Sequence, residues 1–361
     1  MNVLPRNRTL VKLLAFTAVV LVLPHLFDSN YVITVLIFIG LFSMLAMGLS
    51  LLLGYAGQVS LGHAAFYGLG AYGSAILTAT YGWPVIPAAA VTAALVAAIA
   101  ALIGAPILRL AGNYLAMATL ALGIIVFVLF NEAFWLTGGP SGLTGVPRLQ
   151  AFGWVVRQDL HYYYVVWAIL IVLIALSLNL VNSRIGLAMR AIHTSQVASE
   201  TVGVPVARIK VQVFALTALF ASLAGSLWAH YITFVNPAPF GVLKSVMIVV
   251  MAVVGGIASV WGAVAGAALV TLLGEVLRQY LPRFLPGPVS EQEIIVFGAL
   301  LVVVMIFTPQ GLVPSLSAAF TNRRRRPTRQ RAGDAAAHDT ATDAAGVGAR
   351  SDTGPEEVER S

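Results

Sequence analysis

The chain has 361 residues, of which 59% are hydrophobic and only 10% are charged. An ordinary soluble domain has about 25% charged residues, and so few charges could not cover the surface of a soluble protein of this length. No Asp, Glu, Lys or Arg occurs from Ser29 to Leu108, a stretch about four times the roughly 20 apolar residues that cross a bilayer as one helix. The composition excludes a soluble protein and predicts an all-α, polytopic membrane protein.

The formal net charge of +7 and the absence of cysteine limit the function further. Membrane proteins concentrate Lys and Arg in cytoplasmic loops, so the positive charge does not indicate a nucleic-acid partner. Without cysteine, disulfides and cysteine-ligated metals are excluded. The sequence shows no metal-ligand cluster and no nucleophile–base pair. We therefore expect no metal site, no cofactor in this chain and no enzymatic activity.

Breaks in the hydropathy predict about eight to ten membrane-spanning helices. The candidate spans are residues 10–27, 31–53, 60–80, 84–108, 112–136, 162–181, 211–233, 242–258, 260–280 and 292–308. Several are rich in glycine and could be broken or re-entrant: 60–80, 242–258 and 260–280. The sequence leaves open whether 242–280 forms one broken span or two. No cleavage site follows the first hydrophobic run, so we expect it to be retained as a helix.

The charge distribution predicts the domain organisation and the orientation. We expect a cytoplasmic N-terminus with the first helix (1–28), a transmembrane domain (29–314) and a basic, low-complexity tail (315–361) that is disordered. The bias of Lys and Arg places both termini and the loop 182–210 in the cytoplasm, and the loop 137–161 outside. Lys244 and Arg278 are assigned to the outer side of the membrane in this count. The four arginines that open the tail act as a topology anchor, or alternatively bind anionic lipid.

The stretch Gly68–Gly73 has the spacing G-x-G-x-x-G of a dinucleotide-binding loop. Such a loop must follow a buried strand and needs an acidic residue about 20 positions later. Residues 31–53 are instead long enough to span the membrane, and no acidic residue occurs after them until Glu132. We interpret these glycines as small residues that let membrane helices pack closely.

Residues 54–62 combine three glycines with Gln58 and Ser60, and they predict a break in the helix. Backbone groups freed by a break at membrane depth must be buried in protein or face a wet cavity, and transporters hold substrate at such breaks. A similar Gly-Ser-Gly pattern at 256–262 either marks a second half of the same site or arises by chance. The candidate substrate-path residues are Gly54, Gly57, Gln58, Ser60, Gly62, His63, Gly256 and Ser259. For His63, a structural hydrogen bond to a neighbouring carbonyl is the alternative role.

The loop 182–210 contains a short amphipathic helix. Ser183 or Asn182 is placed to cap a helix that starts near Ile185, and Gly203 followed by Pro205 ends it. A small apolar face carries Val197, Ala198, Thr201 and Val202. The segment is either a plain connecting loop or a knob that docks into a groove of a cytoplasmic partner.

Five stretches of the chain together resemble the LivM-type permease subunit of branched-chain amino-acid ABC importers. They are GYAGQVSLGHAAFYGLGAY from Gly54, RLAGNYLAMATLALG (109–123), LTGGPSGLTGVP (136–147), the run from SRIGLAMRAIHTSQVASETVGV to SLWA (183–229), and VVMAVVGGIASVWGAVAGA (249–267). The resemblance covers about residues 30–313. It implies a multi-pass subunit of the prokaryotic inner membrane that pairs with a LivH-type permease.

The resemblance also implies two cytoplasmic ATPase subunits and an extracytoplasmic solute-binding protein as partners. It assigns ATPase docking to Ala198, Glu200 and Gly203, although Val197 stands where ABC permeases in general have Glu. The chain contains no Walker A sequence, so ATP must be hydrolysed by the partners. Branched-chain or related amino acids are the implied substrates, with urea or short amides as the alternative. An ion-coupled secondary transporter is the competing class, for which only Glu275 is a candidate mid-membrane acid. The alternative role of Glu275 is an i,i+3 ion pair with Arg278.

Overall fold

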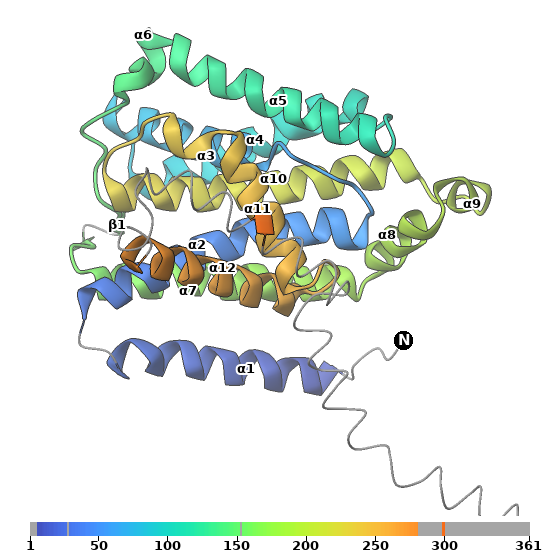
Figure 1. Cartoon of the computed structure of the whole chain (residues 1–361), viewed down its shortest axis with the longest axis horizontal. Helices are drawn as coiled ribbons and strands as arrows, with labels where there is room; N and C mark the ends of the chain where they lie inside the picture. The colour runs from blue at the N-terminus through green and yellow to red at the C-terminus, as the bar shows by residue number, and fades with distance from the viewer. Residues whose placement is uncertain (1–5, 27–28, 152–153, 281–297, 300–361) are drawn as a thin grey trace, which may run out of the picture. The chain divides into compact units, whose positions relative to one another are not determined.

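The computed structural model describes residues 6–26, 29–151, 154–280 and 298–299, and these are largely helical (Figure 1). The helices are α1 (Arg6–Val22), α2 (Asn30–Ser50), α3 (His63–Ala79), α4 (Val85–Ile107), α5 (Asn113–Glu132), α6 (Phe134–Thr137), α7 (Asp159–Val181), α8 (Arg184–Thr194), α9 (Gln196–Thr201), α10 (Val206–Ile232), α11 (Val242–Gly255) and α12 (Val260–Tyr280). Within the described residues, β structure consists of the antiparallel two-residue strands β1 (Gln150–Ala151) and β2 (Trp154–Val155) and an isolated bridge between Leu143 and Val235.

The helix lengths confirm an all-α, multi-pass membrane protein. Six of the described helices are long and apolar enough to cross a membrane, namely α2 with the turn that follows it, α4, α5, α7, α10 and α12. The predicted region 242–280 forms two helices rather than one. At 14 residues, α11 is about 21 Å long, short of the ~30 Å hydrocarbon core. The predicted span 292–308, apart from residues 298 and 299, and the tail 315–361 lie outside the described residues.

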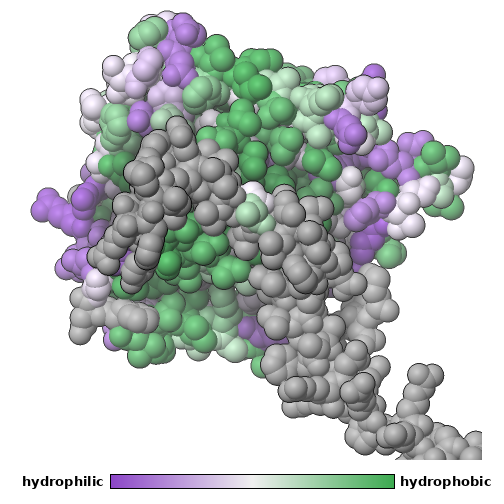
Figure 2. Space-filling view, in the orientation of Figure 1, coloured by the Kyte–Doolittle hydropathy of each residue, from purple (hydrophilic) through white to green (hydrophobic). Residues whose placement is uncertain are grey.

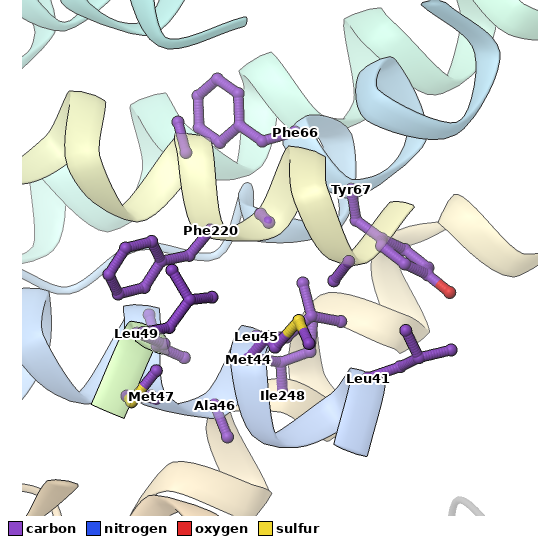
Figure 3. Close-up of a cluster of buried hydrophobic side chains, with 14 of the residues drawn as sticks. Leu41, Met44, Leu45, Ala46, Met47, Leu49, Phe66, Tyr67, Phe220 and Ile248 are labelled. Atoms are coloured by element: carbon purple, nitrogen blue, oxygen red, sulfur yellow. The ribbon is translucent and has the colours of Figure 1, made fainter. Parts of the chain in front are cut away.

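Helix α2 forms the centre of the core. In its most apolar window 72% of the residues are buried, against 28% for α4 and α5. Figure 3 shows Leu49 of α2 close to Phe220 of α10, and Met44 and Leu45 of α2 close to Ile248 of α11. Because α4 and α5 keep large apolar side chains exposed, these two helices can face lipid.

The two ends of the helices carry different connections. In Figure 1, α8 and α9 extend from one end, and the described start of α1 lies at that same end. Strand β1 and helix α6 lie at the opposite end. The structure therefore separates the segment 182–205 from the segment 134–158 by the length of the helices.

The glycines of the G-x-G-x-x-G stretch lie inside α3, where they serve helix packing. A Cβ atom placed on Gly70 would overlap the backbone of Ser222 in α10, and one placed on Gly225 of α10 would overlap the carbonyl oxygen of Tyr67. The two backbones are in contact along this line. The interpretation as a packing motif is confirmed, and no phosphate-binding loop is formed by these residues.

Candidate functional site

The predicted break after the second span is present in the structure. Helix α2 ends in a π-helical turn, Leu51–Tyr55, and residues 56–62 then follow a non-helical path to the start of α3. Gly57 has a φ of 66°, which only glycine adopts without strain. The sequence cannot continue the helix here, and its backbone groups need other partners.

The structure brings the two glycine-containing breaks together. The backbone of Gly54 lies directly against the carbonyl of Ile257, so closely that a Cβ atom would overlap it. The same carbonyl accepts a hydrogen bond from Ser50 Oγ at 2.7 Å. Gly256 and Ser259 flank Ile257, and Ser259 Oγ accepts from the backbone N–H of Gly262 at the start of α12 (3.0 Å).

Three polar side chains of the first break are buried inside the protein. Gln58, Ser60 and His63 are 1%, 2% and 1% exposed. His63 Nδ1 and Ser60 Oγ are hydrogen-bonded at 3.1 Å, so the partner of this histidine is a hydroxyl group and not the backbone carbonyl considered as the alternative role. Both amide atoms of Gln58 and Nε2 of His63 have no hydrogen-bond partner within the described structure.

Unpaired buried polar atoms are unusual, because each costs about 1–3 kcal/mol. The atoms of Gln58 and His63 therefore need an explanation beyond stability, such as water or a solute. Gly62, between them, is packed so tightly that a Cβ atom would overlap the carbonyl oxygen of Thr119 in α5. The first break is thus a polar, closely packed element next to α5 and α12.

The amphipathic segment is two short helices rather than one. Ser183 caps α8 as predicted, because its side chain accepts from the N–H of Gly186. At Ser195 the backbone becomes extended, and its side chain caps the new helix α9 by accepting from Ala198 N–H at 3.3 Å. Gly203, with a φ of 82°, ends α9, and α10 begins directly after Pro205.

The docking candidates lie on an exposed surface at the end of the molecule. Ala198, Glu200 and Gly203 are exposed, and a Cβ atom on Gly203 would meet no neighbour. Val197 and Val202 are 74% and 76% exposed, values at which a valine loses the benefit of burial. Figure 2 shows this protruding part with apolar and polar residues side by side.

A buried lysine contacts the first residue of helix α9 and fixes its position. Lys210 of α10, only 4% exposed, donates to the side chain of Gln196 at 2.9 Å and to the carbonyl of Leu108 at 3.4 Å. The N-terminal end of α9 is therefore anchored to α10, while most of the rest of the helix is exposed.

A histidine that the sequence interpretation left unassigned joins the two parts of the site. His193, at the end of α8, donates from Nδ1 to the carbonyl oxygen of Gly54 at 3.0 Å. Its ring also lies against Gly57, where a Cβ atom would be 2.9 Å from the ring. No spacing in the sequence indicates this contact, because its partners are distant in the chain.

The described residues contain no group of three or more His, Asp or Glu side chains that could hold a metal ion. The acid Glu275 of α12 accepts a hydrogen bond from the hydroxyl of Tyr31 in α2. The two breaks, at residues 54–63 and 256–259, therefore offer backbone, hydroxyl, amide and imidazole groups for binding.

Comparison with known proteins gives consistent results. A family model described as branched-chain amino acid transport system / permease component matches residues 31–306. The high-affinity branched-chain amino acid transport system permease protein LivM of Salmonella typhimurium and that of Escherichia coli are each 31% identical over 76% of this chain and 68% of their own length. The corresponding permease protein LivH of Escherichia coli is 25% identical over 75% of this chain and 91% of its own length.

Proposed function

The chain belongs to the permease family of branched-chain amino acid transport systems, and from this premise we propose that it is one half of an importer. With a second, LivH-like permease it forms the path by which branched-chain amino acids cross the inner membrane of a prokaryotic cell. Two cytoplasmic ATPase subunits supply the energy, and an extracytoplasmic solute-binding protein delivers the substrate. This chain itself performs no catalysis.

The observation that carries the proposal is the connection between α8–α9 and the break of α2. The tip of α9 exposes Val197 and Val202, which suits burial in a groove of a partner. His193, at the end of α8 that adjoins α9, donates a hydrogen bond to the carbonyl of Gly54. A displacement of the tip would therefore be transmitted to the break.

The coupling then follows from the contacts. Closure of the ATPases on ATP would move α8 and α9 as a pair, and His193 would pull on the carbonyl of Gly54. Since Gly54 lies against Ile257, the breaks before α3 and before α12 shift relative to each other. That shift would open the path at one membrane face while closing it at the other, with Gln58, Ser60 and His63 exposed to the substrate in turn.

The proposed orientation places α8, α9 and the N-terminus in the cytoplasm. The start of α1 lies at the same end of the helices as α8 and α9 (Figure 1), in line with the excess of Lys and Arg on those connections. The segment 134–158 then faces the solute-binding protein.

The proposal is tested by reconstituting the chain in proteoliposomes with its second permease, ATPases and binding protein. We expect uptake of L-leucine that needs both ATP and the ATPase subunits. Uphill uptake by this chain without a nucleotide-hydrolysing partner would instead support an ion-coupled secondary transporter. Uptake of urea or acetamide in place of leucine would assign the chain to the alternative substrates.

A further inference from the structure

A cavity of about 480 Å³ lies between α2, α10, α11 and α12, away from the breaks described above. Its volume is in the range of pockets that hold small molecules. Among the lining residues, Tyr31 is 55% exposed, whereas Met251 and Trp228 are 1% and 8% exposed. The cavity therefore leads from the surface into the protein.

One wall of the cavity contains a lysine at membrane depth. Lys244 Nζ lies 4.3 Å from the centre of the Phe42 ring, and Phe42 is about 18 Å along α2 from its first residue. This is near the middle of a hydrocarbon core of ~30 Å. Lys244, which the charge count assigns to the outer side, lies in the first turn of α11, and its ammonium group contacts a residue near the centre of α2. Ionisable residues at this depth mark functional sites.

An acid faces the same cavity at the same level. The backbones of Met251 and Gly255 in α11 lie against Gly266 and Gly262 of α12, respectively, so the two helices run antiparallel. Lys244 lies seven residues before Met251 in α11. It is therefore level with the position in α12 that lies seven residues after Gly266, and this position is two residues before Glu275. Opposite charges thus line one cavity from neighbouring helices.

The rest of the cavity wall is largely apolar, apart from Arg278, which lies on the same helix as Glu275, and Thr34. It contains Phe38 and Phe42 from α2 and Met247 and Met251 from α11, and methionine adapts its shape to different aliphatic groups. Thr271 of α12 also lines the cavity, and its hydroxyl has no hydrogen-bond partner among the described residues. The cavity combines two cations, one anion, an unpaired hydroxyl and a largely apolar wall.

We propose that this cavity is a binding site within the membrane for a zwitterionic α-amino acid with an aliphatic side chain. The ammonium group binds the carboxylate of Glu275, which Tyr31 holds in place. The carboxylate group binds Lys244 and the hydroxyl of Thr271, and the side chain lies against the phenylalanines and methionines. The inference rests on the proposed function and adds the place where this chain holds the substrate.

The test uses photo-crosslinking, which detects weak binding. The reconstituted complex is irradiated with a diazirine analogue of L-leucine, and the labelled peptides are identified by mass spectrometry. We expect label in α2, α11 and α12, removed by excess L-leucine but not by isovalerate or isopentylamine, which each lack one charged group. Glu275→Gln and Lys244→Met should each reduce this label at least fivefold.

Matched variants separate binding from folding. Glu132→Gln and Lys12→Met change exposed residues outside the cavity and should leave the label unchanged, while Glu275→Asp and Lys244→Arg should retain part of it. Label that is unaffected by Glu275→Gln and Lys244→Met, or that appears only on other helices, would overturn the inference.

ATP-dependent leucine uptake in the same vesicles distinguishes this failure from failure of the proposed function, because uptake without label in the cavity contradicts only the site. A labelled cavity in a complex that takes up no leucine contradicts only the proposed function.

Discussion

His193 connects the exposed docking segment to the interior through one side chain. Its hydrogen bond to Gly54 contributes about 0.5–1.5 kcal/mol to stability, too little to hold the fold together. Coupling free energies between sites in proteins are about 1–3 kcal/mol, or 5- to 150-fold in an equilibrium. A single hydrogen bond at this position is therefore large enough to matter for coupling.

Replacing His193 by Ala should reduce ATP-dependent leucine uptake by about fivefold or more while the ATPases stay bound. The reason is that the docking surface of α9 remains intact and only its connection to Gly54 is lost. Uptake and the amount of co-purified ATPase are measured in the same preparation. His161→Ala, an exposed histidine of α7, is the control. Equal uptake by both variants would remove His193 from the coupling.

Gly54 is constrained by its neighbour and not by its φ angle. An alanine there would push its methyl group into the carbonyl of Ile257. Overpacking of this kind costs about 1–3 kcal/mol, so Gly54→Ala should lower the thermal denaturation temperature in detergent. Gly241→Ala, whose nearest atom would be 3.7 Å away, should leave it unchanged. The same denaturation temperature in both variants would mean that the two breaks are not in close contact.

At the scale of elements, α8 and α9 act as one exposed unit with an internal bend at Ser195. Gly203, which ends this unit, has open space around it. A large side chain there would change the docking surface without disturbing the helices beneath. Its positive φ makes any other residue slightly strained.

Gly203→Arg should leave the protein inserted in the membrane but reduce both the bound ATPase and the uptake of leucine about tenfold. Gly145→Arg is the matched control, because Gly145 has a similar φ of 78° and also has open space, in the segment at the opposite end of the helices. The two variants share the backbone strain and the added charge. Equal ATPase binding by both would contradict a docking role for α9.

The sequence was sufficient to predict six of the proposed spans, the break after the second span, and a cap at Asn182 or Ser183, because hydropathy and glycine act locally. It did not reveal the bend at Ser195, since the amphipathic pattern continues across it and only the N-cap serine indicates a new helix. The contact of Lys244 with Phe42 and the contact of His193 with Gly54 were also missed. Both depend on which faces of distant helices meet, and hydropathy does not determine that.

At the scale of the whole molecule, α2 links the regions that this account treats as functional. Its first half lines the cavity with Lys244 and Glu275, and its last turn carries Gly54 and the contacts to α8 and α12. Because α2 is the most buried of the six long helices, motion at one of its ends is resisted by packing along its length. A shift at Gly54 can therefore reach the cavity through α2 or through α12.

The central claim is that energy enters this chain from a cytoplasmic partner at α9. The chain has no cysteine, so Val197→Cys introduces a single thiol at an exposed position, and Thr144→Cys does the same in the opposite segment. With a membrane-impermeant maleimide, we expect Val197→Cys to react in inside-out vesicles only and to be protected when the ATPases are bound. Thr144→Cys should react only in right-side-out vesicles. Reaction of Val197→Cys from the outside, or equal reaction with and without bound ATPases, would contradict the account.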